Sequence, residues 1–161
     1  KDSSAGPIGV IAIVFIVLLK YLSIKNISHF STFTYYSSIF LMPVLPKWTM
    51  VISMFQGRAA REDGLGRLFI GKIGLKEVAV STASLIFLLA ALSLTLSRFI
   101  SNSPYVFYAA LLITMFLLCR MWTNFFNKKF GGLTGDIIGA LSEISEIIFL
   151  LMVIAWSRLF I

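Results

Sequence analysis

The residues best able to do chemistry lie in one short segment, 131–146, where glycines and carboxylates lead into an otherwise apolar run. This segment holds three of the chain's seven acidic residues, Asp136, Glu143 and Glu146. A carboxylate is costly inside a bilayer, so it stays there mainly where a function requires it. The segment therefore predicts a metal or phosphate site at a membrane surface.

The spacing of the three carboxylates favours one side of a helix. Asp136 and Glu143 are seven residues apart, which places them about 20° from the same helical face, and Glu146 follows on the same side. Small residues between them, Gly139 and Ala140, leave room for an ion. Hard oxygen ligands indicate Mg²⁺ or a similar cation. Two simpler interpretations stay open: Asp136 as a helix cap, and Glu146 as the partner of a basic residue on a neighbouring helix.

The glycines before this helix indicate an anion. Glycine lets backbone N–H groups approach a phosphate closely, and a helix N-terminus adds partial positive charge. We therefore expect the residues that lead into the helix to contact a phosphate-bearing substrate: Gly131, Gly132, Thr134 and Gly135.

A second group of residues with suitable chemistry lies in the segment 58–72, which mixes arginines, glycines and a terminal Lys72. Arginine binds phosphate through two parallel hydrogen bonds, and a glycine-flanked loop can close over it. The simpler interpretation is an ordinary basic loop with solvated charges.

Lys47 lies inside an apolar run, where a lysine is costly unless it faces the bundle interior and pairs with a carboxylate or ligand. A functional Lys47 is the favoured interpretation.

The rest of the chain is strongly apolar. Hydrophobic residues make up 58% of the 161 residues, charged residues 13%, and the mean hydropathy is +0.93. Soluble domains carry about 25% charged residues, so the composition excludes a soluble protein and predicts an integral membrane protein. The net charge of +7 is concentrated around apolar runs, which argues against nucleic-acid binding.

Five apolar runs are each long enough to cross a bilayer with about 20 residues. They are continuous rather than alternating, which favours helices over a barrel. Pro43 and Pro46 predict that the second helix is broken or bent. We expect an all-α membrane protein, one domain over 1–161, built as a bundle of about five transmembrane helices at approximately 7–24, 35–56, 78–98, 104–126 and 137–158.

Counting from span to span places the segments 1–6, 57–77 and 127–136 on one face of the membrane. This face carries eight lysines and arginines, whereas the other has Lys25 with Arg98 and Arg158 at span ends. The positive-inside rule places the first face in the cytoplasm. All eleven glycines lie on this face or in the adjoining helical turns. We therefore expect functional loops on the cytoplasmic face.

Three segments, in this order, resemble the motifs of the cobalamin synthase family, the adenosylcobinamide-GDP ribazoletransferases. They are KDS at 1–3 with its following glycines, REDGLG at 61–66 with FIGK at 69–72, and GGLTGDIIGALSEISE at 131–146. The resemblance covers most of the chain and its motifs are specific.

The resemblance implies transfer of the adenosylcobinamide-phosphate group of adenosylcobinamide-GDP to α-ribazole or its 5′-phosphate, with release of GMP. It implies Mg²⁺ as cofactor and a multi-pass protein of a bacterial or archaeal inner membrane. The resemblance also implies roles for individual residues. The metal would be bound by Asp2, Asp136 and Glu143, with Glu146 next, and a carboxylate would accept the hydroxyl proton. The phosphates would be held by Lys47, Arg61 and Lys72.

The chain also departs from the family pattern. The family's N-terminal part, with further carboxylates, has no counterpart here, so we expect an upstream segment, or another or a second chain, to complete the site. Ser4 and Lys47 stand where the family has arginine.

A CDP-alcohol-type phosphotransferase is the main alternative function, although its spaced aspartates are not found. A small-solute transporter is another, but it gives no reason for glycine-rich loops on one face.

Overall fold

The computed structural model describes residues 6–61, 65–96 and 104–160. In these ranges the chain forms five α-helices and one short 3₁₀ helix: α1 (Pro7–Ile27), α2 (Thr32–Gln56), η1 (Leu65–Leu68), α3 (Leu75–Leu96), α4 (Pro104–Phe130) and α5 (Gly135–Phe160). All five α-helices are long and apolar enough to cross a membrane. The predicted all-α membrane bundle is confirmed, and each expected span overlaps one helix.

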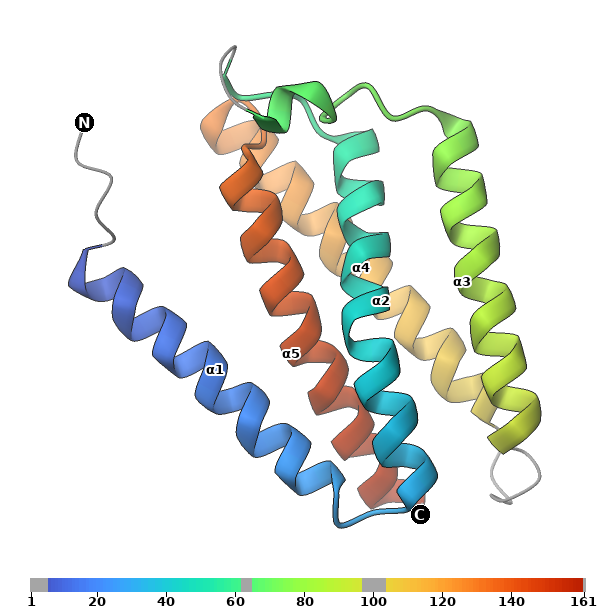
Figure 1. Ribbon diagram of the computed structural model, residues 1–161. Coiled ribbons are helices and arrows are strands. Elements are labelled where there is room, and N and C mark those ends of the chain that lie inside the picture. The colour runs from blue at the N-terminus through green and yellow to red at the C-terminus, as the bar shows by residue number, and fades with distance from the viewer. Residues whose placement is uncertain (1–5, 62–64, 97–103, 161) are drawn as a thin grey trace.

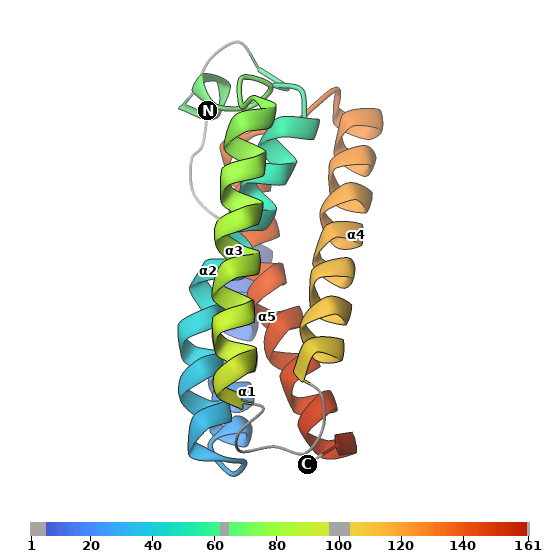
Figure 2. The same cartoon turned by 90° about the vertical axis from the view of Figure 1, so that its right-hand side faces the viewer.

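Helix α2 lies in the middle of the bundle (Figure 1). It packs most extensively against α5 and also contacts α3 and α4. Helices α3 and α4 diverge toward the end that carries the 3₁₀ helix, as both views show (Figures 1 and 2). Helix α1 crosses the bundle obliquely and packs on α5, with its first turns leaning away from the other helices (Figure 1).

The ends of α2 are fixed by local hydrogen bonds. Ser31 precedes the helix, and its hydroxyl oxygen accepts the N–H of Thr34 at 3.1 Å, which caps the first turn. At the other end the N–H of Gly57 donates to the Ser53 carbonyl at 2.8 Å, and the chain then leaves in an extended conformation. This exit directs the following segment across the end of the bundle.

Pro43 and Pro46 lie inside α2 without ending it, so the expectation of a helix broken at these prolines is corrected. Each proline removes one backbone donor. Membrane helices tolerate this loss because neighbouring helices and Ser or Thr side chains satisfy the remaining groups. The carbonyls that lose a donor are those of Ile39 and Met42, four residues before the prolines. The second span is therefore one continuous helix at the centre of the bundle.

The bundle interior combines close apolar packing with a few polar contacts. Leu45, Met115 and Phe149 are fully buried and come from three different helices. Side-chain hydrogen bonds join α2 to three of its neighbours: Ser53 to Thr123 of α4 at 2.9 Å, Thr49 to Ser145 of α5 at 3.3 Å, and Trp48 to Thr82 of α3 at 3.0 Å. Such contacts fix the register of α5, which carries the acidic segment.

Candidate active site at the loop end of the bundle

Two loops that are distant in sequence are joined at one end of the bundle. Ala59 and Leu133 form a parallel backbone bridge. The N–H of Leu133 donates to the Arg58 carbonyl at 2.7 Å, and the N–H of Ala60 donates to the Leu133 carbonyl at 2.9 Å. Leu133 is itself buried beneath the loops. The α2–α3 and α4–α5 connections therefore lie together, as the counting of spans predicts (Figure 1).

Glycines make this close approach possible. A Cβ atom on Gly132 would lie 2.4 Å from the Arg58 carbonyl oxygen and 2.7 Å from the Ala60 nitrogen. A Cβ on Gly66 would lie 2.9 Å from the backbone nitrogen of Gly135. At these two positions the absence of a side chain lets one backbone segment pack directly against another. The predicted contact of Gly132 with a phosphate stays a prediction.

The N-terminus of α5 lies beneath the joined loops. The Thr134 hydroxyl accepts the N–H of Ile137 at 3.3 Å, so Thr134 rather than Asp136 caps the helix. In the described part of the chain, no hydrogen bond engages the N–H groups of Gly135 and Asp136. The Asp136 residue is exposed in this first turn. A helix end with free donors favours a bound anion.

The surrounding loop is rich in positive charge. Arg58, Arg61 and Lys72 all lie in the α2–α3 connection and are exposed. Arg61 follows Ala60, the residue that hydrogen-bonds to the α4–α5 loop. Lys129, at the end of α4, is held over the ring of Phe125 at 5.4 Å. The loop end therefore carries exposed cationic side chains as well as free N–H donors, which suits a phosphate-bearing ligand.

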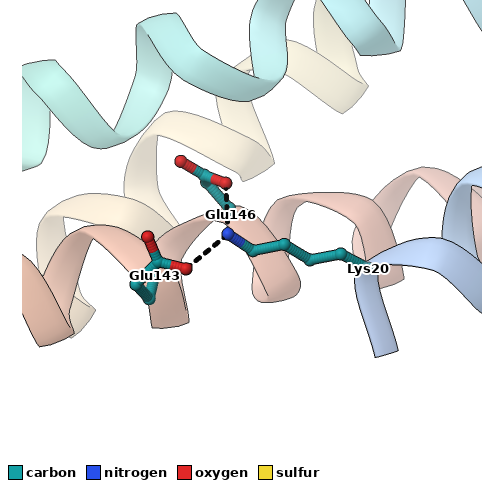
Figure 3. Close-up of polar contacts among 3 residues, drawn as sticks. All are labelled: Lys20, Glu143 and Glu146. Atoms are coloured by element: carbon teal, nitrogen blue, oxygen red, sulfur yellow. Dashed lines mark hydrogen bonds and ion pairs between the residues drawn. The ribbon is translucent and has the colours of Figure 1, made fainter. Parts of the chain in front are cut away.

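The two remaining carboxylates of the acidic segment have a different environment (Figure 3). The ammonium of Lys20, in α1, lies 2.5 Å from a Glu143 oxygen and 2.6 Å from a Glu146 oxygen. The open interpretation of Glu146 as the partner of a basic residue on a neighbouring helix is confirmed. Sequence reasoning missed Lys20, although a lysine inside an apolar run and acids inside another are a recognisable signal of such a pair.

The residues predicted to bind a metal ion are only partly brought together. Among the described residues, no three His, Cys, Asp or Glu side chains converge on a point where they could hold an ion. Asp136 and Glu143 are separated by about 10 Å along the helix axis, given seven residues of 1.5 Å rise. Asp2 lies outside the described residues. Asp136 is exposed and no described residue pairs with it, while the space between Glu143 and Glu146 already contains an ammonium.

Lys47 lies away from this end, in a groove of about 340 Å³ between α2 and α3. Its residue is exposed, and its ammonium contacts the Met50 sulfur at 3.8 Å. Trp48 and Ser81 also line the groove. No ion pair of Lys47 with a described carboxylate is present, so it does not pair with the acidic segment. Its predicted contact with substrate stays a prediction.

Replacing Lys47 with methionine is expected to stabilise the protein by about 2 kcal/mol, because an ammonium without an anionic partner is costly within the membrane. The measurement is unfolding in detergent, with Lys25→Met as a control because Lys25 lies at the exposed end of α1. A loss of stability in Lys47→Met would instead reveal an anionic partner of this lysine.

Comparison with known proteins agrees with the motifs at the loop end. A sequence model of the cobalamin-5-phosphate synthases matches residues 1–154. An adenosylcobinamide-GDP ribazoletransferase of Thermodesulfovibrio yellowstonii is 36% identical over 115 residues, covering 71% of this chain and 42% of that protein. The Geotalea daltonii protein of the same name is 32% identical over 155 residues, covering 96% and 57%. This chain thus spans about half the length of these relatives. No solved structure matches it.

Proposed function

This chain belongs to the cobalamin-5-phosphate synthase family, and we propose that it acts as an adenosylcobinamide-GDP ribazoletransferase. The proposed reaction joins adenosylcobinamide-GDP to α-ribazole or its 5′-phosphate and yields adenosylcobalamin or its phosphate plus GMP. The observation that carries the proposal is the junction of the two glycine-rich loops over the N-terminus of α5. This junction gathers free N–H donors, an exposed carboxylate and arginines, which together suit a pyrophosphate.

The proposed chemistry is substitution at phosphorus. The ribazole 3′-hydroxyl oxygen forms a new P–O bond with the phosphorus attached to cobinamide. The bond from that phosphorus to the bridging oxygen breaks, GMP leaves with the bridging oxygen, and the hydroxyl proton is lost to a base. Such transfers depend on positioning and charge neutralisation more than on covalent help from the protein. Arg61, Lys72 and the N–H groups of Gly135 and Asp136 would supply the neutralisation.

Mg²⁺ forms part of the proposal. A bound Mg²⁺ would neutralise the pyrophosphate oxygens. Asp136 is the described carboxylate that fits, because it is exposed beside free N–H donors and no described residue pairs with it. Glu143 and Glu146 share the ammonium of Lys20. Asp2, outside the described residues, is proposed to contribute to the same ion.

The five helices indicate a multi-pass membrane protein. We propose that the loop end faces the cytoplasm of a bacterial or archaeal cell and that the protein lies in the inner membrane. The support is the excess of lysine and arginine in the loops of this end. Outward-facing apolar side chains along α1, such as Ile8 and Ile11, would contact lipid.

Because the chain spans about half the length of its relatives, we propose that further residues complete the site. These residues would come from the rest of the same polypeptide, another chain or a second copy. The support is that the described carboxylates do not converge on one ion.

The test in cells uses the complete reading frame that contains this chain. It is expressed in a bacterial strain that lacks its own ribazoletransferase and needs cobalamin for growth. We expect growth on added cobinamide and cobalamin in the cell extract. Expression in the membrane without cobalamin formation would contradict the proposal.

Replacing Arg61 with alanine is expected to lower kcat/KM for adenosylcobinamide-GDP about 10- to 100-fold, because hydrogen bonds to charged groups contribute about 1.5–3 kcal/mol. Lysine at this position keeps the charge but loses the two-pronged geometry, so it restores only part of the rate. The matched control is Arg158→Ala, which removes an exposed arginine from the last turn of α5. Equal rates in the two alanine variants would exclude Arg61 from the site.

A further inference from the structure

The pairing of Lys20 with Glu143 and Glu146 is the most polar contact between two membrane-spanning helices in the described chain. One ammonium lies between two carboxylates that are three residues apart on α5, at 2.5 and 2.6 Å (Figure 3). The side chains of Lys20 and Glu146 are only 16% and 15% exposed, while that of Glu143 is 47% exposed. The contact is therefore shielded on one side and open on the other.

Elementary electrostatics explains why the lysine is needed. Two ionised carboxylates on neighbouring turns of one helix repel each other, and the repulsion grows as water is removed. A cation between them relieves the repulsion. A bound metal ion is one solution, and the ammonium of Lys20 is another that the chain carries itself. Removal of one partner of a shielded ion pair leaves an uncompensated charge.

The contact ties α1 to α5, on which α1 mainly packs. Only Ser23 and Ile27 of α1 are buried, and both lie near its C-terminal end. Lys20 is thus the polar anchor nearest to the freely exposed half of the helix. Thirteen residues separate Lys20 from Pro7, or about 20 Å of helix. A tilt of about 10° at Lys20 would therefore shift the start of α1 by about 3 Å, calculated from this rise.

We propose that Lys20 is a positioning residue whose ammonium takes the place of a metal ion between Glu143 and Glu146. Its role is to dock α1 on α5 and so to set the distance from the start of α1 to Asp136. The significance for catalysis rests on the proposed function, because Asp136 is the described carboxylate proposed there for the metal ion. The docking itself does not depend on that function.

The first test measures the position of α1 without any substrate. Spin labels are placed at the exposed residues Val10 of α1 and Phe55 of α2, after Cys119, the single cysteine of the chain, is changed to alanine. We expect one narrow distance distribution with Lys20 in place and a distribution at least twice as wide in Lys20→Met. Lys20→Arg keeps the charge and is expected to restore the narrow distribution. An unchanged distribution in Lys20→Met would overturn the proposal.

The second test asks whether the ammonium stands in for a metal. Mn²⁺, detected by electron paramagnetic resonance, reports the number of divalent ions bound per chain. Lys20→Met is expected to bind one Mn²⁺ more than the unmodified chain, and the added change Glu146→Gln is expected to remove it. If a correctly folded Lys20→Met gains no Mn²⁺, the stand-in role is wrong.

A neutral variant covers the case in which Lys20→Met fails to fold. The triple change Lys20→Met, Glu143→Gln and Glu146→Gln leaves no uncompensated charge at the contact. It is expected to fold and to show the same widened distance distribution. A narrow distribution in this variant would contradict docking by charge. Neither test uses ribazole transfer, so failure of the proposed function would appear separately, as absent GMP release by the unmodified protein.

Discussion

Replacing Asp136 with asparagine is expected to lower the rate of cobalamin formation at least 100-fold while the protein still inserts into membranes. Asparagine has the same size but no charge, so the variant loses the carboxylate that we propose for the Mg²⁺ ion. Removal of one group that stabilises developing charge typically costs about 100- to 1,000-fold in rate. The Thr134 cap and the loop bridge do not involve the Asp136 side chain. Folding should therefore persist.

The measurement is the rate of cobalamin formation by the complete protein in membranes, with the amount of inserted protein determined by immunoblot. Glu77→Gln is the matched control, because Glu77 is also an acid in the first turn of a helix at this end. Its carboxylate accepts the N–H of Gly74 at 2.8 Å, so its loss affects a local cap. A rate near that of the unmodified protein in Asp136→Asn would exclude the metal role.

Replacing Gly132 with alanine is the second prediction with a large effect. An added Cβ would lie 2.4 Å from the Arg58 carbonyl oxygen and 2.9 Å from the Ala59 carbonyl carbon, and backbone atoms cannot turn aside as a side chain can. The two loops must then separate, which breaks the hydrogen bonds of Leu133. We expect a loss of about 3 kcal/mol in stability, near the upper end of ordinary single-residue effects. Activity should fall with it.

The matched control for this loop is Gly139→Ala. A Cβ at Gly139 meets nothing within 4 Å, and the residue lies inside α5, where alanine is the better helix former by about 1 kcal/mol. Unfolding in detergent should therefore give a lower free energy of unfolding for Gly132→Ala, and a higher one for Gly139→Ala, than for the unmodified protein. Similar stability in Gly132→Ala and the unmodified protein would show that the loops do not need this contact.

Much of the fold could be predicted because a long run of apolar residues is a strong signal that can be read from a short stretch of sequence. Runs of about 20 apolar residues can hardly do anything except cross a membrane, and the predicted run 7–24 lies within α1. Counting spans then fixes which loops share a face. The contact between Ala59 and Leu133 confirms this part of the reasoning.

The lateral arrangement of the helices could not be predicted in the same way. In water an apolar stripe marks the buried face of a helix, but in a membrane the lipid-facing side is apolar as well. Helix α1 is apolar over most of its surface, so its pattern marks Lys20 as an unusual residue but does not say which helix the lysine faces. The pairing with Glu143 and Glu146 became visible only in three dimensions. The expectation of a break at the prolines of α2 was wrong, because propensity alone does not include the support of neighbouring helices.

The sequence allows candidate site residues to be named one by one, but it does not show how they lie relative to one another. The helical period predicts that Asp136 and Glu143 lie on one side of a helix. It does not take into account that the two residues are far apart along the helix axis. Glycine at 132 was expected to serve a ligand, whereas the structure shows that it also permits the close contact of two loops. Close approach of two backbones is a property of the folded chain that no local pattern reveals.

The reaction that we propose for this protein releases GMP as cobinamide phosphate is joined to ribazole. The direct measurement supplies the complete purified protein, in lipid nanodiscs, with adenosylcobinamide-GDP, α-ribazole and Mg²⁺, and follows both products by chromatography. We expect GMP and adenosylcobalamin in equal amounts, and neither product without α-ribazole or in the Asp136→Asn variant. Folded protein that forms no cobalamin, or that releases GMP without joining ribazole, would contradict the account.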